Sequence, residues 1–421
     1  MGIERIPVEQ FVQLSQIHTV IDVRSDAEYA HAHIPGASSI PLFNDEERAI
    51  VGTIYKQQSR EDAIKKGLEF FGPKMKLMLL ESEALIKEKN PDNKTVLVHC
   101  WRGGMRSAAV AWLLDLYGFK VYTLIGGYKA FRNWVLNELG KHHPFQILGG
   151  NTGSGKTIVL QALANLGEAV VDLEGLAGHK GSAFGNIGLP KQPSQEMFEN
   201  KLSLAIKIER EKYPDKNIWL EDESQRIGAV NIPQAMWAHM RKSNIVFLDI
   251  PFPARLDYLV DTYGALDCIA LREAIVRIQK RLGGLETKTA IAALEEKDFH
   301  GCFDVLLKYY DKQYRKGLEN REDPKPDIMM VLAEKVNNEE KVITPFALMG
   351  LIDKPQIHKK AAAIYIKNKS DKLKENKFGL TRKKFLELLK KYKDSNTQRC
   401  HTLWLWKNWT VVTLLVIRVF K

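Results

Sequence analysis

A single cysteine lies in a short segment whose neighbours are suited to making it reactive. In HCWRGGMRS, residues 99–107, Cys100 is followed by two glycines and by Arg102 and Arg106. A helix N-terminus stabilises a thiolate, the reactive form of cysteine, because its unpaired N–H groups point at the negative charge. The loop amides predict an anion-binding nest, and the two guanidinium groups suit an oxyanion. The segment predicts a nucleophilic cysteine beside a phosphate-like group, with a buried core cysteine as the alternative.

A second motif predicts a phosphate-binding loop. GNTGSGKT, residues 150–157, fits G-x-x-x-x-G-K-[S/T], follows the apolar FQIL and opens a helical pattern. Its glycines let backbone N–H groups approach phosphate oxygens, while Lys156 reaches the terminal phosphate and Thr157 can bind a metal ion such as Mg²⁺. Any diphosphate ligand would satisfy the same amides, so the motif does not establish ATP hydrolysis. The phosphate-binding residues that we predict are Gly150, Gly153, Ser154, Gly155, Lys156 and Thr157.

An acidic residue at the end of a neighbouring strand usually accompanies such a loop. Each candidate here ends an apolar run, and the candidates are Asp172, Glu221, Asp222 and Asp249. Any of them could instead cap a helix or satisfy a turn. All four stay open on the sequence, as does the need for magnesium.

Two series of strands alternating with helices position these motifs. In residues 1–139, strands are expected at 18–25 and 95–99, and a helix is expected from about Arg106. A further strand, a Gly-Gly turn and a closing helix follow in KVYTLIGGYKAFRNWVLNEL. Alternating strands and helices predict a parallel sheet. GKHHP, residues 140–144, then marks a junction.

A second α/β domain is expected over residues 144–350. Strands are predicted in EAVVDLEG, NIWLED and NIVFLDIP, and mostly helical sequence runs from about 265 to 320. The fold class is therefore α/β, with two parallel-sheet domains in succession. Residues 351–421 form a lysine-rich tail of open status: a solvated amphipathic helix, added electrostatic affinity for RNA, or an extension not natural to the fold.

Composition places the basic charge mostly in that tail. The 421 residues have a net charge of +11, but residues 354–421 hold 18 Lys+Arg and 4 Asp+Glu, which leaves 44 and 47 for residues 1–353. Contact between the body and a nucleic acid therefore needs a local patch. Four scattered cysteines argue against a disulfide framework or a zinc site. With no signal-peptide core and no membrane-spanning run, we expect a cytoplasmic protein.

Two stretches around the cysteine segment resemble rhodanese domains. They are VIDVRSDAEYAHAHIPGASSIP (20–41), which is similar to the opening of those domains, and LIGGYKAFRNW (124–134), which is similar to their close. In that family the cysteine carries sulfur or selenium as a persulfide-type intermediate. Ordinary sulfurtransferase loops resemble Cys-x4-Arg, whereas this loop has one more residue. The wider loop suggests a donor in which the chalcogen is attached to phosphate.

Over roughly residues 5–350 the chain resembles the bacterial tRNA 2-selenouridine synthases. Besides the cysteine segment and the phosphate-binding loop, the matching stretches are GTIYKQQSREDAIKKG (52–67), DLEGLAGHKGSAFG (172–185) and EDESQRIG (221–228). The resemblance implies a rhodanese-like domain followed by a P-loop domain. It implies a transferase acting on 2-thiouridine at the wobble position of the lysine, glutamate and glutamine tRNAs.

The resemblance also implies two reaction steps. The sulfur of 2-thiouridine is first alkylated by geranyl diphosphate, with Lys156 stabilising the diphosphate leaving group. Selenium from selenophosphate then replaces it, carried by Cys100 as S-selanylcysteine, while Arg102 and Arg106 hold the phosphate of the donor. Trp101 could stack on a base or pack as an aromatic lid. Further candidates for contact with diphosphate or tRNA, each of which could instead lie in a solvated loop, are His179, Lys180, Ser182 and Arg226.

Three other functions are compatible with the same motifs. The His-Cys-x5-Arg-Ser spacing also fits a cysteine-dependent phosphatase fused to an ATP-binding domain, although HIPGA, residues 33–37, disfavours it. A sulfurtransferase using thiosulfate would differ only in its donor. A non-catalytic rhodanese-like module that regulates a nucleotide-binding switch would not need Cys100.

Overall fold

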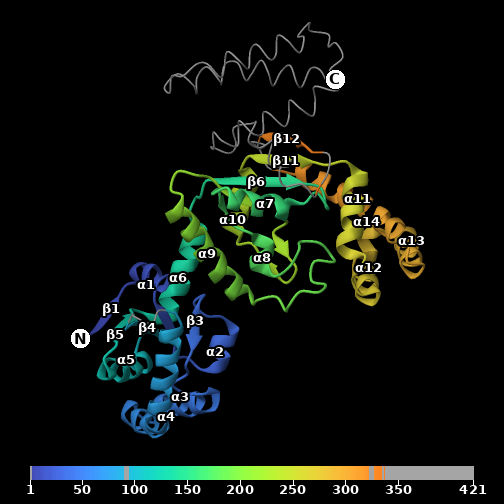
Figure 1. Cartoon of the computed structure of the whole chain (residues 1–421). Coiled ribbons are helices and arrows are strands. Elements are labelled where there is room, and N and C mark those ends of the chain that lie inside the picture. Colours follow the sequence, from blue (N-terminus) through green and yellow to red (C-terminus); the bar gives the residue numbers. More distant parts are fainter. Residues whose placement is uncertain (1, 90–93, 322–326, 334–335, 337–421) are drawn as a thin grey trace, which may run out of the picture. The chain divides into compact units, whose positions relative to one another are not determined.

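The computed structural model describes residues 2–89, 94–321, 327–333 and 336. They belong to one compact unit, residues 1–339. The strands form two five-stranded sheets and one short antiparallel pair (Figure 1). The lysine-rich tail predicted at residues 351–421 lies outside the described residues.

The first sheet has the strand order β1-β5-β4-β2-β3, and every neighbouring pair is parallel. Its elements in chain order are β1 (Ile3–Ile6), α1 (Val8–Ser15), β2 (Thr19–Asp22), α2 (Asp26–His31), β3 (Ala37–Ser39), α3 (Asp45–Gln57), α4 (Arg60–Lys89), β4 (Thr95–His99), α5 (Met105–Tyr117), β5 (Lys120–Leu124) and α6 (Gly127–Gly140). The strand expected at 18–25 is shorter as β2, because the Ser25 N–H already bonds the Glu28 side chain at the start of α2.

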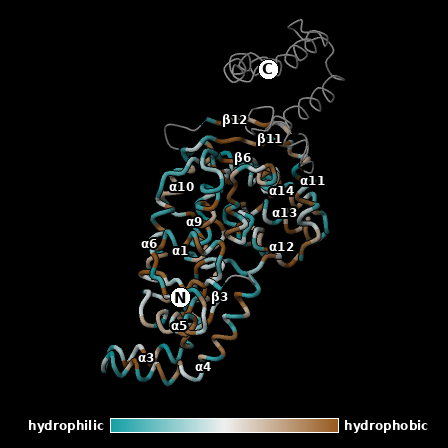
Figure 2. The backbone as a smooth tube through the Cα atoms, turned by 60° about the vertical axis from the view of Figure 1, so that its left-hand side comes forward, coloured by the Kyte–Doolittle hydropathy of each residue, from teal (hydrophilic) through white to brown (hydrophobic). Residues whose placement is uncertain are grey.

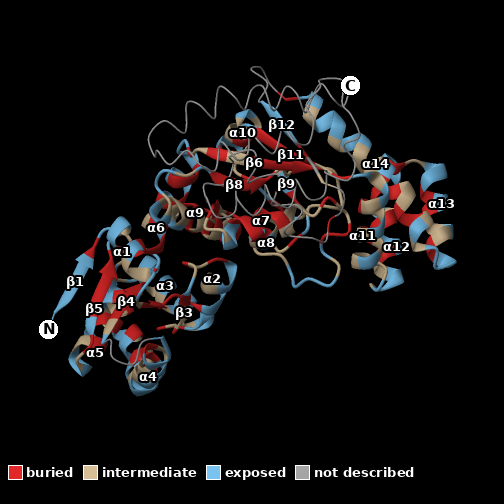
Figure 3. Ribbon diagram, turned by 45° about the horizontal axis from the view of Figure 1, so that its top comes forward, coloured by how far each residue is buried: buried red, intermediate tan, exposed pale blue. Residues whose placement is uncertain are grey.

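Hydrophobic side chains cover both faces of this sheet. Val96 and Val98 of β4 pack in one core cluster with Phe71 of α4, whereas Leu97 belongs to another cluster with Phe131 of α6. Successive residues of a strand point to opposite faces, so one apolar run supplies both cores. Figure 3 shows most of β4 and β5 in red, as buried residues, and most of the edge strand β1 in pale blue, as exposed residues. The sheet thus holds the end of β4, where the cysteine loop begins, from two sides.

The second sheet has the order β12-β11-β6-β8-β7 and is also parallel throughout. The elements of this half are β6 (Phe145–Gly150), α7 (Lys156–Asn165), β7 (Ala169–Val170), α8 (Leu173–Ala177), α9 (Gln195–Lys212), β8 (Ile218–Glu221), β9 (Arg226–Ile227), β10 (Val230–Asn231), α10 (Gln234–Lys242), β11 (Ile245–Asp249), α11 (Phe252–Tyr263), α12 (Cys268–Leu282), α13 (Gly284–Glu295), α14 (Phe299–Glu319) and β12 (Ile328–Leu332). The predicted α/β class with parallel sheets is confirmed.

Helices α11 to α14 have a hydrophobic core of their own. Leu271 and Ile275 of α12, Leu294 of α13 and Leu306 of α14 are buried in it. Their spacing of three to four residues along each helix directs the apolar side chains to one face. The opposite face of α14 therefore takes no part in this core.

Helices α3 and α4 pack against each other, and both contain polar and apolar residues in alternation. In Figure 2 the tube alternates between brown and teal along both helices. Phe71 and Met78 of α4 are buried, whereas Leu77 is 59% exposed. Of the helices in the described residues, none combines the length and the hydrophobicity that crossing a membrane requires.

Candidate active sites

Cys100 lies where β4 ends and the loop to α5 begins. The residue is 3% exposed, and its Sγ lies 3.3 Å from the Oγ of Ser107 in the first turn of α5. The helix begins at Met105, one residue before the expected start, with Gly104 as its N-cap. A thiolate here would face the N-terminus of α5 and could accept a hydrogen bond from Ser107. Because Cys100 is buried, a donor must reach its sulfur through the loop that covers it.

Two glycines bring the turn before α6 into contact with the cysteine loop. Gly103 and Gly127 have φ angles of +64° and +61°, in the left-handed region that favours glycine. A Cβ atom on Gly127 would lie 2.3 Å from the Gly103 nitrogen and 2.4 Å from the Cys100 carbonyl oxygen. That oxygen accepts a hydrogen bond from the Tyr128 N–H at 2.8 Å. The Gly-Gly pair in LIGGY thus lets two backbone segments touch, which fixes the path of the cysteine loop.

Arg106 and Arg102 differ in what surrounds them. The Nη1 of Arg106 lies 2.8 Å from the Oε2 of Glu28, and Arg48 pairs with the same carboxylate at 3.1 Å. Burial acts to raise the pKa of Glu28, but the hydrogen bond and charge of Arg106, with the charge of Arg48, lower it. Arg102 is exposed and has no acidic partner within 4 Å in the described part of the chain. Arg102 is thus available to an anion, whereas Arg106 must share its charge with Glu28.

A buried network of charges supports the loop from below. Arg24 pairs with Asp22 at 2.6 Å, and its guanidinium carbon lies 3.8 Å from the centre of the Tyr128 ring. The Nε2 of His99 lies 3.7 Å from the Oδ2 of Asp22. Burial lowers the pKa of His99 and so keeps its ring neutral near pH 7. Asp22 and Arg24, part of the rhodanese-like stretch, are therefore connected to the cysteine loop through Tyr128, whose N–H bonds the Cys100 carbonyl oxygen.

Tyr128 also connects the cysteine loop with α9. Its hydroxyl donates to the Oε1 of Glu196 at 2.7 Å and accepts from the Nδ2 of Asn200 at 2.8 Å. Arg132, one turn along α6, donates to the Oδ1 of Asn200 at 2.6 Å. The Trp101 side chain, 37% exposed, lies with its ring centre 5.7 Å from that of Tyr128. Hydrogen bonds thus run from the backbone of the cysteine loop to a helix of the second half.

Residues 150–157 run from the last residue of β6 through a loop, residues 151–155, into the first turn of α7. Gly153 and Gly155 have φ angles of +78° and +75°, which side chains rarely adopt. The Nζ of Lys156 donates to the carbonyl oxygen of Gly150 at 3.0 Å. The Ser154 hydroxyl is buried, without a hydrogen-bond partner among the described residues. This path brings backbone N–H groups, a lysine and a helix N-terminus together, an arrangement that binds phosphate.

Two of the four acidic candidates hold α8 in place. Asp172 is its N-cap and accepts a hydrogen bond from the Gly175 N–H at 2.7 Å. Glu221, fully buried at the end of β8, accepts from the Leu173 N–H at 3.0 Å. Burial, together with the charge of Asp172, raises the pKa of Glu221 well above its usual value. Asp172 therefore caps a helix, which was the stated alternative to a role beside the phosphate-binding loop.

Of the other two candidates, Asp222 directly follows β8 and Asp249 is the last residue of β11. Asp222 accepts a hydrogen bond from the Tyr314 hydroxyl at 2.7 Å and pairs with Arg321. The same hydroxyl accepts the Gly150 N–H at 3.1 Å, so Asp222 holds α14 against the start of the phosphate-binding loop. Asp249 ends β11, and among the described residues no hydrogen bond joins its side chain to residues 150–157.

Two carboxyl groups that the sequence analysis did not select face the phosphate-binding loop. The Oε2 of Glu174 lies 3.3 Å from the Oγ1 of Thr157, and Glu174 and Glu223 are hydrogen-bonded to each other. Burial and the charge of Glu174 raise the pKa of Glu223 to about 8, although the nearby Lys156 acts in the other direction. The pair therefore keeps a proton at neutral pH. The sequence feature that could have pointed to these two glutamates is their position in the stretches DLEGLAGHKG and EDESQRIG.

The glycine-rich segment over residues 178–185 covers this pair. A Cβ atom on Gly181 would lie 2.6 Å from the Oε2 of Glu223 and 2.8 Å from the Oε1 of Glu174. The exposed Lys180 has its Nζ 5.4 Å from the centre of the Tyr263 ring, and the Ser182 side chain bonds Tyr263. Burial and the charge of Glu174 raise the pKa of Tyr263 to about 12. Lys180 and Ser182 therefore lie at the rim of the phosphate-binding site.

His179 and Arg226 have other surroundings. His179 is 8% exposed, and a Cβ atom on Gly185 or on Gly228 would lie within 2.7 Å of its ring. Burial lowers its pKa, so the ring is neutral near pH 7. The exposed Arg226 donates to the carbonyl oxygen of Gly228 at 2.8 Å. The structure thus places His179 inside the loop packing rather than at its surface.

Oxygen ligands for a divalent cation are present beside Lys156. Thr157 and Glu174 supply a hydroxyl and a carboxylate, the ligand types that Mg²⁺ takes together with substrate phosphates. In the described residues there is no group of three or more His, Cys, Asp or Glu side chains arranged to hold a metal ion. The residues therefore fit a magnesium ion that shares its ligands with a bound diphosphate, and not an all-protein metal site.

Both α/β parts of the chain match known protein families. Residues 8–133 match the rhodanese-like domain family, and residues 143–336 match the tRNA 2-selenouridine synthase AAA domain family. The tRNA 2-selenouridine synthase of Bdellovibrio bacteriovorus is 33% identical over 365 residues, covering 76% of this chain and 94% of its own. That of Sulfurovum sp. is 34% identical, covering 71% and 88%. That of Nitrosomonas europaea is 38% identical, covering 58% and 63%. The chain therefore belongs to the tRNA 2-selenouridine synthase family.

Proposed function

We propose that the chain replaces the sulfur of wobble 2-thiouridine in tRNA by selenium, in two steps at two sites. The substrates are the lysine, glutamate and glutamine tRNAs, with geranyl diphosphate and selenophosphate as co-substrates. The observation that carries the proposal is the position of Cys100, with its Sγ at the N-terminus of α5 beside Ser107 and its loop flanked by Arg102 and Arg106. Family membership supports the overall reaction.

The first step takes place at the phosphate-binding loop. The thiocarbonyl sulfur forms a bond with the first carbon of the geranyl chain, the bond from that carbon to the diphosphate oxygen breaks, and the N3 proton of the base is released to solvent. Lys156 and the amides at the start of α7 stabilise the charge that develops on the leaving diphosphate. A magnesium ion held by Thr157 and Glu174 would add positive charge beside the same phosphates. The product carries a thioether, a better leaving group than the thiocarbonyl sulfur.

The second step takes place at the cysteine loop. The Cys100 thiolate bonds to the selenium of selenophosphate while the Se–P bond breaks, and its electron pair leaves with phosphorus as phosphite, which gives S-selanylcysteine. The terminal selenium then bonds to C2 of the base and displaces the geranyl thiolate. A small-molecule thiol cleaves the S–Se bond, so that selenium stays on the base at the selenide level and Cys100 is left as a mixed disulfide, which a second thiol reduces. Arg102, which is exposed, and Arg106 hold the phosphate of the donor. Trp101, partly exposed beside the loop, offers a ring on which the base can stack. We expect the reaction to occur in the cytoplasm, where the free thiols of Cys100, Cys268 and Cys302 stay reduced.

Nucleoside analysis of tRNA tests the proposal. Cells that lack the protein should lose 2-selenouridine and keep 2-thiouridine, and the wild-type chain should restore 2-selenouridine. Lys156→Ala should leave 2-thiouridine unalkylated, whereas Cys100→Ser should accumulate S-geranylated 2-thiouridine. Lys212→Ala, at the exposed end of α9, and Cys268→Ser, at the exposed start of α12, are matched controls that should restore 2-selenouridine.

Three results would contradict the proposal. Unchanged 2-selenouridine in cells lacking the protein would exclude this reaction. Full restoration by Cys100→Ser would exclude the cysteine as the selenium carrier. Hydrolysis of a simple phosphate ester that depends on Cys100, with no change in tRNA nucleosides, would favour a cysteine-dependent phosphatase instead.

A further inference from the structure

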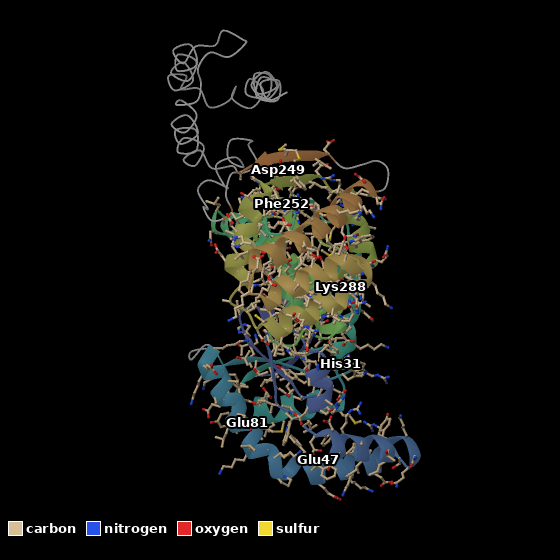
Figure 4. The ribbon with its side chains drawn as sticks, turned by 90° about the vertical axis from the view of Figure 1, so that its right-hand side faces the viewer. His31, Glu47, Glu81, Asp249, Phe252 and Lys288 are labelled. Carbon is tan, nitrogen blue, oxygen red and sulfur yellow. The ribbon has the colours of Figure 1, made fainter. Side chains whose placement is uncertain are left out.

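Helix α14 carries a row of basic side chains beside a cleft. Lys308, Lys312, Arg315 and Lys316 are all exposed, and their spacing of three to four residues puts them on one face of the helix. With Phe252, at the start of α11, they line a cleft of about 480 Å³. Figure 4 shows Phe252 close to Asp249, near the end of β11, and Figure 3 shows much of α14 in pale blue. We call this surface the α14 cleft.

The positive charge of the α14 cleft is only partly neutralised. Lys308 pairs with Asp304 at 2.6 Å on the same helix. The acidic residues of the lining are Asp311, which is occupied by the guanidinium of Arg255, and Glu319. Among the described residues, no carboxylate lies within 4 Å of the cationic atoms of Lys312, Arg315 or Lys316. The cleft thus concentrates positive charge, although residues 1–353 together have 44 Lys+Arg against 47 Asp+Glu.

The α14 cleft is attached directly to the phosphate-binding loop. Arg255 donates from Nη1 to the Oδ1 of Asp311 at 2.8 Å and to the carbonyl oxygen of Thr152 at 3.0 Å. On α14 itself, the Tyr314 hydroxyl accepts the N–H of Gly150 at 3.1 Å. Two residues of the loop are therefore hydrogen-bonded to the elements that line the cleft. A ligand held in the cleft is held at a fixed position relative to the loop.

We propose that the α14 cleft binds the sugar–phosphate backbone of the tRNA substrate and so presents its anticodon to the phosphate-binding loop. Lys and Arg side chains are the usual partners of nucleic acid phosphates, and they fix register without reading sequence. The partly exposed Phe252 offers an apolar surface to a ribose or an unstacked base. The identity of the bound polyanion rests on the function proposed above. The location of the docking surface rests on the cleft, its charge and its bonds to the loop.

Direct binding of a tRNA transcript to the full chain tests this inference. Lys312→Glu combined with Lys316→Glu should weaken binding at least tenfold near physiological salt. The slope of log affinity against log salt should fall in magnitude by about two, because each lost cation releases about one counterion fewer. Lys56→Glu combined with Lys76→Glu, on α3 and α4, changes the net charge equally. This control should bind within about threefold of wild type with an unchanged slope.

Defined outcomes overturn the docking surface. Unchanged tRNA binding by the Lys312/Lys316 double variant would exclude it. An equal loss of affinity in both double variants would also exclude it, because the loss would then be a diffuse effect of net charge. If the double variant unfolds, Arg315→Gln replaces it, with at least a threefold loss expected and an unchanged affinity as the contrary result. Polyglutamate that binds as tightly as tRNA, with the same dependence on Lys312 and Lys316, would mean an acidic protein partner.

Failure of the proposed function would give a different result. Wild-type chain that binds the transcript through the α14 cleft but leaves 2-thiouridine unchanged would exclude the proposed chemistry and leave the docking surface intact. If the wild-type chain converts 2-thiouridine and the Lys312/Lys316 variant binds tRNA normally, the docking surface would be excluded and the proposed chemistry would stand.

Discussion

The contact between Gly127 and the cysteine loop leads to a sharp prediction about Gly127→Ala. The new Cβ atom would lie 2.3–2.4 Å from the Gly103 nitrogen and the Cys100 carbonyl oxygen, whereas ordinary contact begins at 3.4 Å. Relieving that overlap requires the cysteine loop and the turn before α6 to separate by about 1 Å. A displacement of this size at a reacting group can lower a rate about a hundredfold. Selenium transfer through Cys100 should therefore fall by about that factor.

The same substitution should also destabilise the fold. A non-glycine residue in the left-handed region costs about 1–2 kcal/mol. Separating the loops weakens the bond from the Tyr128 N–H to the Cys100 oxygen, and a buried group left without its partner costs about 1–3 kcal/mol. We expect a total loss of about 2–5 kcal/mol in the free energy of unfolding. Gly118→Ala is the matched control, because φ there is +103° and nothing lies within 4 Å of the added Cβ.

Two assays on the purified variants separate these contributions. Urea unfolding should show a loss of about 1–2 kcal/mol for Gly118→Ala and a larger loss for Gly127→Ala. Single-turnover transfer of selenium to alkylated tRNA should be normal in Gly118→Ala and severely slowed in Gly127→Ala. Equal stability and equal transfer in the two variants would refute the claim that this glycine fixes the position of Cys100.

Two further predictions concern the phosphate-binding site. Because burial raises the pKa of Glu223 to about 8, the stability that its proton supplies is fully present below the usual pKa of 4.5 and is lost as pH rises toward 8. The thermal unfolding midpoint of the ligand-free protein should therefore fall between pH 6 and pH 8, and Glu223→Gln should flatten that dependence; an unaltered pH profile would contradict the burial of the pair. Tyr314→Phe removes the hydroxyl that joins Gly150 to Asp222, so it should cost about 1–3 kcal/mol in urea unfolding and weaken binding of geranyl diphosphate. Wild-type values for both measurements would exclude the hydroxyl as a support of the loop.

Local patterns were sufficient to predict two parallel sheets and the elements beside both loops, but not the edge strands β1, β3 and β12. The apolar run VLV, which is buried on both faces of the sheet, was predicted as a strand, and the alternation of strands with helices predicted the parallel sheet. The start of α5 at Met105 was expected one residue later, because a glycine cap leaves little signal for the exact boundary. The glycine spacing of residues 150–157 indicated a tight turn before a helix, and Gly153 and Gly155 do have positive φ angles.

Contacts between distant segments account for what the sequence did not predict. Glu174 and Glu223 meet because β8 lies between β6 and β7, and strand order cannot be read from the periodicity of single strands. Asp222 follows β8 as expected, but its partner Tyr314 lies 92 residues further along the chain. The Glu28 that binds Arg106 lies 78 residues before it. Local spacing reveals which residues are chemically capable, whereas the fold decides which of them meet.

Mass measurement of Cys100 during the reaction tests the central claim most directly. Intact chain would be incubated with selenophosphate, digested, and analysed for selenium on the peptide that contains Cys100, before and after addition of tRNA bearing S-geranylated 2-thiouridine. We expect one selenium atom on that peptide, and its loss as 2-selenouridine appears in the tRNA. A peptide that never acquires selenium while 2-selenouridine still forms would contradict the account, as would a selenium adduct that persists after the tRNA has been converted.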